Sequence, residues 1–374
     1  MTDEKYIPLH TPLTGEEEEK ALIAAVRSGK LGPDAAYTRQ FEEKIKQFTG
    51  ARHITALQSG TAALHLLLKA MGIGKNDRVI LPVHTFVATA NPVLYVGAEP
   101  VLTDVETDTY NMAPAYLERA IEKSIAEGKK PAAVILVHMY GLAAKTDEIA
   151  TITRHYGIPL IEDAAEAIGT FDKERHAGTI GDAGFLSFNS NKTLTAAGGG
   201  AAIVPDKAMA EYIAFLARQA KENYPYYYHK EPGYNYQLSN LQAAAGMAQF
   251  AKAEKILRRK REIHRFYKEN LQDLPVKIVE ELPGARSNYW LNLMEMESGR
   301  PADLIDFMQG RRIEVRHVWY PLHRMPLFAN APYFGNGETE ALFNRAVVLP
   351  SGPALTDADL ERVVRSLHDF FRYL

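Results

Sequence analysis

One lysine of this sequence, Lys192, is expected on a loop that glycines bound. The stretch FLSFNSNKTLTAAGGGAAIV, residues 185–204, places it after a short apolar run and before Gly198, Gly199 and Gly200. A primary amine held on such a loop can form a Schiff base with a carbonyl compound. Three consecutive glycines are typical of a close backbone approach or of unusual dihedral angles. The alternative interpretation is a solvated lysine beside a flexible turn.

Two other segments carry groups suited to an anion and to a cation. In ITALQSGTAALHLLLKAMGIG an expected strand leads into Ser59, Gly60 and Thr61 and then into an apolar helix. The N-terminus of a helix can bind phosphate, although the same residues also make an ordinary N-cap.

In PLIEDAAEAIG an apolar strand ends at Glu162 and Asp163. Ligands of open α/β sheets bind beyond the carboxyl ends of strands, so one of these acids is expected to face a pocket; a solvated strand end is the alternative.

These three features together match the needs of pyridoxal phosphate. That cofactor requires an amine for a Schiff base, an acid beside its pyridinium nitrogen and an anion site for its phosphate. The order of the three segments along the chain also agrees with this interpretation.

The elements that must position these residues follow an alternating pattern. Between residues 40 and 205, helical segments separate strand-like runs, which is the pattern of βαβ units and a mostly parallel sheet. From about residue 240 the pattern changes to long helices, and the segment QFAKAEKILRRKREIHRFYKENLQDLP has apolar residues at near-helical spacing. We therefore expect a large α/β cofactor-binding domain over 1–245 and a smaller α+β domain over 246–374. The strand-like runs are RVILP (78–82), AAVILVH (132–138), IPLIED (158–163) and GFLSFN (184–189).

Composition excludes several classes of protein. The chain has 374 residues, of which 46% are hydrophobic and 24% charged, and its net charge of -3 provides no general attraction to nucleic acid or anionic lipid. It contains no cysteine, so disulfides, thiolate metal sites and a cysteine nucleophile are excluded. It has neither an apolar signal core nor an uninterrupted apolar run of about 18 residues. We expect a cytoplasmic protein without a nucleic-acid or membrane partner. The basic run 258–261 is expected to form a solvated helix face.

At this point the sequence resembles the DegT/DnrJ/EryC1/StrS family of sugar aminotransferases. Five segments carry the resemblance, in the family's order and over nearly the whole chain: SGTAALHLLLKAMGIGKNDRVILPVHTFVATANPVLYVGAEPVLTDV, EDAAEAIG, SFNSNKTLTAAGGG, GYNYQLSNLQAA and WYPLH. The resemblance implies the fold type I aminotransferase architecture and a homodimer with active sites at the subunit interface. It also implies transfer of an amino group from glutamate to a keto group of a nucleotide-linked sugar.

The resemblance assigns roles to individual residues. Lys192 matches the Schiff-base lysine, which would also move the proton between carbon centres. Asp163 matches the acid that keeps the pyridinium nitrogen protonated. Asn235, in GYNYQ, matches a phosphate contact donated by the neighbouring subunit. The other implied cofactor-binding residues are Phe86, stacked on the ring, Glu166, near the ring, and the phosphate contacts Gly60, Thr61 and Ser187.

The sequence indicates the substrate less specifically than it indicates the cofactor. The segments FNSNK, RHVWYPLH and NRAVVLPSGPALTDADLERV look more like members that act at C4 of 4-keto-6-deoxy sugars, such as those making GDP-perosamine, than members that act at C3. His317 and His323 could contact the substrate or be structural. Gln237 stands where the family commonly has an arginine linked to anionic substrate groups, and Ser190 where close relatives often have glycine. The tyrosine-rich stretch 222–236 could cover the substrate, with loop packing as the alternative.

Three alternative functions fit these residues less well. A dehydratase of the same family would carry histidine at the Schiff-base position, where this chain has Lys192. A non-enzymatic regulatory role does not need a full set of cofactor residues. A metal-dependent hydrolase would have to use His84, Asp104, His138 and Asp163, which lack a compact ligand spacing.

Overall fold

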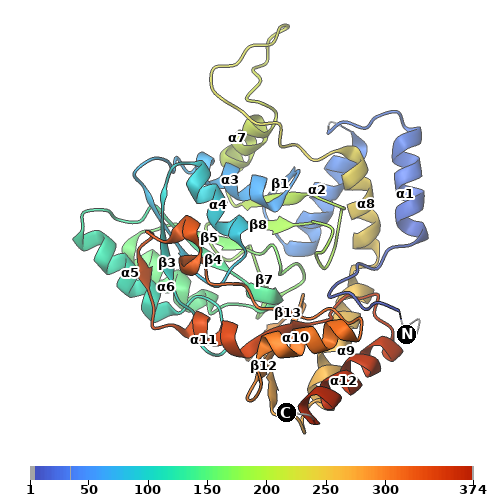
Figure 1. Cartoon of the computed structure of the whole chain (residues 1–374). Helices are drawn as coiled ribbons and strands as arrows, with labels where there is room; N and C mark the ends of the chain where they lie inside the picture. The colour runs from blue at the N-terminus through green and yellow to red at the C-terminus, as the bar shows by residue number, and fades with distance from the viewer. Residues whose placement is uncertain (1–4, 34, 373–374) are drawn as a thin grey trace.

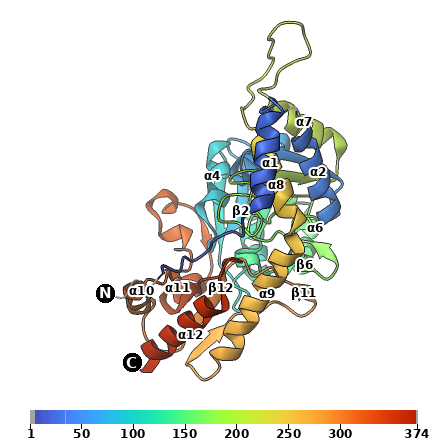
Figure 2. The same cartoon turned by 90° about the vertical axis from the view of Figure 1, so that its right-hand side faces the viewer.

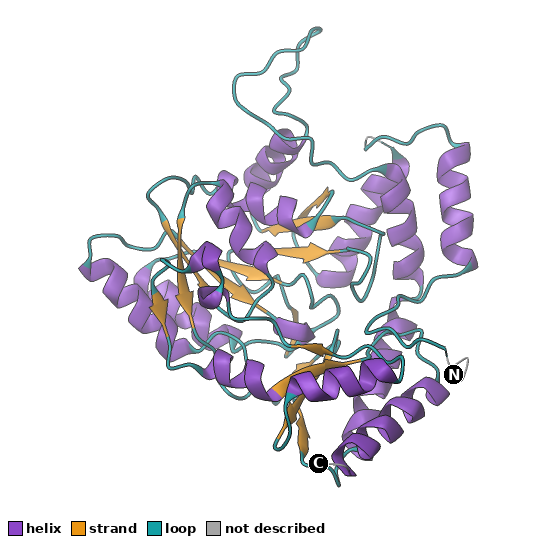
Figure 3. Cartoon of the chain, viewed as in Figure 1, coloured by secondary structure: helices purple, strands orange, loops and turns teal. Residues whose placement is uncertain are grey.

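A computed structural model describes residues 5–33 and 35–372 of the chain. In it, helices cover both faces of a large sheet, and a smaller sheet lies with the C-terminal helices (Figure 1). Figure 3 colours the strands apart from the helices around them. Among the residues described, no helix is long and apolar enough to cross a bilayer.

The large sheet has eight strands in the order β1-β9-β8-β5-β4-β2-β3-β14. Neighbours from β8 to β14 pair in parallel, whereas β9 is antiparallel to both β8 and β1. The sheet is therefore mostly parallel, as the alternating sequence pattern predicts. Its strands are β1 (His53–Leu57), β2 (Arg78–Pro82), β3 (Glu99–Thr103), β4 (Ala133–Val137), β5 (Leu160–Asp163), β8 (Ala183–Ser187), β9 (Gly200–Val204) and β14 (Tyr333–Phe334).

Both faces of this sheet are buried, which explains its continuously apolar strands. In β2, Val79 and Leu81 pack in one hydrophobic core and Ile80 packs in another, because successive side chains of a strand point to opposite faces. Helices α3, α4 and α7 contribute to the first core, and α5 and α6 to the second. The helices beside this sheet are α1 (Glu16–Arg27), α2 (Ala36–Thr49), α3 (Gly60–Ala70), α4 (Val87–Tyr95), α5 (Pro114–Ala126), α6 (Thr146–Tyr156), α7 (Lys207–Ala217), α8 (Asn240–Ala251) and the 3-10 turn η1 (Met139–Gly141).

The C-terminal part is built on a four-stranded antiparallel sheet in the order β10-β12-β15-β13. Residues of α9, α10 and α12 share one hydrophobic core with it. A third, three-stranded sheet joins β11 to β6 and β7. These strands are β6 (Phe171–Asp172), β7 (Arg175–His176), β10 (Val276–Ile278), β11 (Ala285–Arg286), β12 (Asn292–Met296), β13 (Arg316–His317) and β15 (Ala346–Leu349). The remaining helices are α9 (Ala253–Asn270), α10 (Pro301–Gly310), η2 (Leu322–Arg324), η3 (Pro326–Phe328), α11 (Glu338–Arg345) and α12 (Asp357–Arg372).

The long helical run near residue 250 is divided. Helix α8 packs against α1 and α2, and α9 contacts α12 instead. The break is at Lys252, whose φ of -117° and ψ of 16° are not helical. Figure 2 shows α8 and α9 one after the other along the length of the molecule. The predicted domain boundary between 245 and 246 stays a prediction, since β14 returns from the C-terminal part to pair with β3.

The expectation of a solvated basic face at 258–261 is wrong for Lys260. Its side chain is fully buried, and its Nζ donates to the carbonyl oxygens of Trp290 at 2.8 Å and Ser351 at 2.6 Å. On an α-helix, positions of one charged run point in different directions, so a run of four cannot lie on a single face.

Candidate active site

The predicted cofactor residues gather around one cavity of ≈ 430 Å³. It lies beyond the carboxyl ends of β4, β5 and β8 and beside the N-terminus of α3, which is the edge where open α/β sheets bind ligands. Seven of the predicted residues line it: Gly60, Thr61, Phe86, Asp163, Glu166, Ser187 and Lys192.

Lys192 points into this cavity between an acid and an aromatic ring. Its Nζ lies 3.7 Å from Glu166 Oε1 and 4.1 Å from the centre of the Trp290 ring. The indole Nε1 of Trp290 donates to the carbonyl oxygen of Asn191 at 2.7 Å, which ties the ring to the residue before the lysine. The amine is thus held by its neighbours, and the interpretation as a solvated loop lysine is wrong.

The glycines near this loop bring it against the start of α3. Gly199 has a φ of +111°, and its N–H donates to the carbonyl oxygen of Gln58 at 2.9 Å. A Cβ atom on Gly200 would lie 2.4 Å from the backbone nitrogen of Gly60, which leaves no room for a side chain. Both expected reasons for the glycines, a close approach and a positive φ, are confirmed.

The two adjacent acids at the end of β5 point in opposite directions. Asp163 faces the cavity, and its carboxylate accepts hydrogen bonds from Thr89 Oγ1 at 2.7 Å and from the Ala165 N–H at 3.0 Å. Burial raises the pKa of Asp163, and these donors and the charge of Lys192 only partly oppose that shift. A buried carboxylate with two neutral donors is suited to pair with a cation.

Glu162 lies fully buried on the other side of the strand. It accepts hydrogen bonds from His138 Nε2 at 2.9 Å and from the N–H groups of Gly178, Ile180 and Gly181. Burial alone would raise its pKa, but these donors hold the pKa of Glu162 below its ordinary value. Of the two acids, Asp163 is the one that faces the pocket.

Thr89 is a site residue that the sequence reasoning missed. The Thr89 hydroxyl donates its single proton to the Asp163 carboxylate. Thr85 must therefore be the donor in the 2.7 Å contact between the hydroxyls of Thr85 and Thr89. The two threonines are four residues apart, Thr85 just before the N-cap of α4 and Thr89 in its first turn, and their hydroxyls are in contact. That spacing in HTFVATAN was the available signal. Trp290, Trp319, Arg316, Asn189 and Asn191 also line the cavity, and no spacing in the sequence pointed to them.

Glu166 lies between Lys192 and the residues on the opposite side of the cavity, Tyr140 and Trp319. Its Oε2 accepts a hydrogen bond from the Tyr140 N–H at 2.8 Å, and Tyr140 has a φ of +53°. The phenol oxygen of Tyr140 in turn accepts from the Trp319 N–H at 2.9 Å. Burial raises the pKa of Glu166 to about 7, in spite of the opposing charge of Lys192. This acid is therefore able to exchange a proton near neutral pH.

Phe86 is half-exposed at the mouth of the cavity. Its ring is 48% exposed and lies 5.0 Å from the Trp319 ring at an interplanar angle of 44°. A core phenylalanine, the alternative interpretation, would be buried, so this ring is free to cover a ligand. Ser187 and Gly60 lie in contact at the other end, since a Cβ on Gly60 would be 3.1 Å from Ser187 Cβ.

Three predicted residues do not line this cavity. His317 stacks on Phe343 at 4.5 Å and lines a small adjoining cavity. His323 stacks on Tyr333 at 4.1 Å, and its Nε2 lies 2.7 Å from Glu340 Oε1. Their contribution to substrate binding stays a prediction.

Asn235, the third, is exposed at the base of a long projecting segment. It pairs with Arg218 in a single antiparallel bridge. Residues 222–236, here called the tyrosine arm, stand out beyond α7 in both views of the molecule (Figures 1 and 2). Tyr226 is 61% and Tyr227 82% exposed, so this arm does not cover the cavity of its own chain.

The side chains of the metal-hydrolase alternative have other partners. Asp104 accepts from the Thr339 N–H and from the hydroxyl of Tyr333, and His138 pairs with Glu162. Across the part of the chain that the structure describes, no three His, Asp or Glu side chains are grouped to hold a metal ion.

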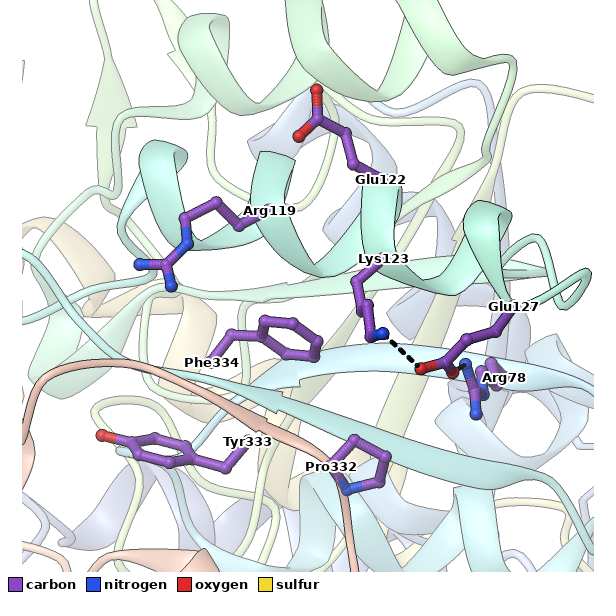
Figure 4. A pocket seen from close by; sticks show the side chains of 8 residues that line it. All are labelled: Arg78, Arg119, Glu122, Lys123, Glu127, Pro332, Tyr333 and Phe334. Atoms are coloured by element: carbon purple, nitrogen blue, oxygen red, sulfur yellow. Dashed lines mark hydrogen bonds and ion pairs between the residues drawn. The ribbon is translucent and has the colours of Figure 1, made fainter.

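A second hollow, of ≈ 540 Å³, lies between α5 and β14 (Figure 4). It shares no residue with the cavity of Lys192. Three of its charged residues pair with one another: Arg78 contacts Glu127 at 2.6 Å, and Lys123 contacts Glu127 at 3.4 Å. We assign no ligand to it.

Comparisons with known proteins agree with this geometry. Residues 12–368 match the DegT/DnrJ/EryC1/StrS aminotransferase family. The chain is 40% identical over 98% of its length and 96% of the relative's to EpsN of Bacillus subtilis (strain 168), which carries the name of a pyridoxal phosphate-dependent aminotransferase. It is 32% identical over 98% of its length and 99% of the relative's to a GDP-perosamine synthase of Escherichia coli O157:H7.

A solved structure extends the likeness to three dimensions. The crystal structure of a DegT DnrJ EryC1 StrS aminotransferase from Brucella abortus superimposes with a TM-score of 0.90 at 32% identity, covering 95% of each chain. The expected α/β architecture of a fold type I aminotransferase is thereby confirmed. The chain belongs to the DegT/DnrJ/EryC1/StrS family and is a pyridoxal phosphate-dependent aminotransferase.

Proposed function

We propose that this enzyme transfers the amino group of L-glutamate to the C4 keto group of a nucleotide-linked 4-keto-6-deoxy sugar. The observation that carries the proposal is the placement of Lys192 in one cavity with Asp163 and Glu166. An amine, a carboxylate of raised pKa and a proton-exchanging acid are the groups that amino transfer needs.

The cavity residues fit pyridoxal phosphate. The buried carboxylate of Asp163 would hold the pyridinium nitrogen, because its neutral donors leave its charge without a cationic partner in contact. Gly60 and Thr61 begin α3, whose free N–H groups and positive dipole end suit a phosphate, and Ser187 adjoins them. Phe86 would cover the ring. When bound, the cofactor supplies a carbonyl that condenses with amines and a ring that accepts electrons.

The chain's own residues would then manage protons. The amine of Lys192, once free, is the group able to carry a proton between the reacting carbons. Glu166, with a pKa of about 7 and its Oε1 at 3.7 Å from Nζ, is placed to accept or return a proton at that amine. Thr89 orients the carboxylate of Asp163. Trp290 closes one side of the lysine, which limits the access of water.

The sugar acceptor is supported by the names of the relatives. Three of them are GDP-perosamine synthases, from Escherichia coli O157:H7, Vibrio cholerae and Caulobacter vibrioides, at 31–32% identity over 98% of this chain. A further relative at 30% identity is the spore coat polysaccharide biosynthesis protein SpsC of Bacillus subtilis (strain 168). The resemblance of FNSNK and RHVWYPLH to members that act at C4 supports the carbon position.

A homodimer with shared sites is part of the proposal. The tyrosine arm projects from the chain with Asn235 exposed at its base, where it can donate to a phosphate held in a second copy. A neutral amide donor suits that role, because it stabilises a dianion without adding a charge.

One assay tests the reaction. Purified enzyme is offered glutamate and a panel of UDP-, GDP- and dTDP-linked 3-keto and 4-keto sugars, and the aminated product is identified by NMR. We expect amination at C4. Amination at C3, or loss of a hydroxyl without amination, would contradict the proposal. Lys192→Ala is the control variant and should abolish turnover while the protein stays folded.

A complementation experiment tests the shared site. Lys192→Ala and Asn235→Asp homodimers should each be inactive, the second because a carboxylate is set against the phosphate. If Asn235 acts on the other subunit, exchange of subunits concentrates both defects in one site and leaves the other intact. Activity should then return on mixing. Confirmed exchange by native mass spectrometry without any recovery would rule out the assignment.

A further inference from the structure

A small cavity of ≈ 70 Å³ adjoins the cavity of Lys192. Four buried ring nitrogens around it have no hydrogen-bond partner within the described chain: Nδ1 and Nε2 of His10, Nδ1 of His317 and Nε1 of Trp319. Three such rings around one cavity are unusual, because buried polar atoms in proteins are nearly always paired. The remaining wall is largely apolar, with Leu9, Leu291 and Val348.

The two cavities share one wall. Asn191, Trp290, Arg316 and Trp319 line both of them, so a ligand next to Lys192 can extend into the smaller one. Hydrogen bonds to neighbouring residues fix the two tryptophans of this shared wall. Lys260 fixes the backbone of Trp290, and the Trp319 N–H donates to the phenol of Tyr140 at 2.9 Å.

Three residues of this cavity present donors, Trp319, Arg316 and His10, and the His10 ring also presents one acceptor nitrogen. The indole Nε1–H of Trp319 can only donate, and so can the guanidinium of Arg316 at the rim, which Glu314 holds at 2.6 Å from Nε. Burial, together with the charges of Lys260 and Lys192, keeps the pKa of His10 well below its ordinary value, so the neutral ring offers one N–H. An anion such as a carboxylate only accepts hydrogen bonds, whereas a hydroxyl group also has a proton to donate. A small cavity that has donors in its wall and lies next to the charge of Lys192 therefore suits the anion better.

We infer that the cavity of His10, His317 and Trp319 is the subsite for a carboxylate of the amino donor. This inference rests on the proposed function, in which a dicarboxylic amino acid delivers the amino group at Lys192. A volume of ≈ 70 Å³ exceeds the roughly 30 Å³ that one water molecule occupies, so a carboxylate group fits. The sugar acceptor then makes no contact with the rings of His10 and His317, which do not line the cavity of Lys192.

Tryptophan fluorescence provides a direct test without turnover. The sequence contains two tryptophans, Trp290 and Trp319, and both line this cavity. The cofactor-free protein is titrated with glutarate, which has both carboxylates of glutamate but no reactive amine. Glutaramide, its neutral diamide, is the ligand control. We expect a saturable fluorescence change with glutarate and none with glutaramide over the same concentrations.

Variants locate the binding. Trp319→Phe and His10→Phe should each raise the dissociation constant of glutarate at least 10-fold, with Trp290 as the reporter in the first. Tyr320→Phe is the matched control, because Tyr320 is exposed and lines neither cavity. Thermal unfolding midpoints verify that each variant is folded. In the loaded enzyme His10→Phe, which alters a residue outside the cavity of Lys192, should slow the half-reaction with glutamate and leave the half-reaction with the keto sugar unchanged.

The outcomes separate this inference from the proposed function. If wild-type protein binds glutarate and both variants bind it equally well, the subsite lies elsewhere, although glutamate remains the donor. If glutaramide binds as tightly as glutarate, or if only the sugar half-reaction is affected, the cavity takes a neutral group and the inference is overturned. If wild-type protein neither binds glutarate nor reacts with glutamate, both proposals fail.

Discussion

The two faces of strand β5 carry neighbouring carboxylates with opposite properties. Glu162, on the closed face, accepts four hydrogen bonds and has a lowered pKa. Asp163, on the cavity face, accepts two and has a raised pKa. Both are buried, so burial alone does not decide the difference. The number of hydrogen-bond donors decides the difference. On the closed face, donors of the chain stabilise the charge of Glu162, whereas on the cavity face the charge of Asp163 is left for a ligand to stabilise.

The donor on the closed face is also fixed in its protonation. His138 Nδ1 accepts from the Ala144 N–H at 3.2 Å, so its Nε2 carries the proton that Glu162 accepts. The His138 imidazole and three backbone N–H groups therefore support one carboxylate. We infer that Glu162 holds the loop 178–181 to the strand, whereas Asp163 serves the reaction.

The largest effect that separates the two faces is expected for Asp163→Asn. Turnover should fall at least 10³-fold, because loss of an ion pair to a developing charge in a closed site removes about 4 kcal/mol from transition-state stabilisation. The unfolding free energy of the cofactor-free protein should stay equal or rise, since the raised pKa means that the charge is unfavourable there. Steady-state kinetics and urea unfolding measure the two. Near-normal turnover would mean that another residue holds the nitrogen.

The opposite result is expected for Glu162→Gln. The amide cannot accept from all three backbone N–H groups and His138, so the unfolding free energy should fall by about 3 kcal/mol. The rate per folded molecule should change little. Denaturant unfolding is the measurement, with the exposed Glu122→Gln as control. A loss of activity without a loss of stability would reverse the roles of the two faces.

Two acids near the strand should also respond to pH with opposite signs. The stability contributed by Glu162, whose folded pKa is lowered, is present above its unfolded pKa near 4.5 and lost as the pH falls through the folded pKa. The stability contributed by Glu166, whose folded pKa is about 7, is complete below pH 4.5 and lost as the pH rises through 7.

Glu166→Gln should therefore flatten the pH profile of the cofactor-free protein. Between pH 4.5 and 8, the wild-type unfolding free energy should decrease relative to the variant by roughly 3 kcal/mol, because the pKa rises from 4.5 to about 7 and each unit corresponds to about 1.4 kcal/mol. Urea unfolding at five pH values measures the difference. Parallel profiles would show that Glu166 does not titrate in this range.

The smallest effects are expected at the two threonines beside Asp163, and Thr89→Val should have the larger one. Removing one of the two donors to Asp163 leaves its carboxylate less well oriented, and one neutral hydrogen bond contributes about 1 kcal/mol, so turnover should fall roughly 10-fold or less. Thr85→Val, one step further from the carboxylate, should have a smaller effect still. Steady-state kinetics at saturating substrate would measure both, and equal losses would contradict the donor order derived for the two hydroxyls.

Local chemistry was readable from the sequence because it depends on neighbours along the chain. The run RVILP predicted a strand of a mostly parallel sheet, and β2 spans Arg78–Pro82. Triple glycine after Lys192 predicted the close approach that Gly200 makes to Gly60. Asp163, at the end of a strand, and Gly60, at the start of a helix, were predicted because such ends meet at one edge of a parallel sheet, whereas Phe86 and Glu166 came from the family resemblance.

Only the tertiary structure decided which side chains complete the site. Trp290 and Trp319 come from the C-terminal part and reach Lys192 because that part folds back onto the sheet edge. The buried position of Lys260 depends on carbonyls of Trp290 and Ser351, far from it in sequence. Sequence alone determined the reactive groups and the elements that carry them. Which acid faces the ligand and which rings enclose it followed from packing between distant segments, since burial and hydrogen-bond donors come from neighbours in space rather than along the chain.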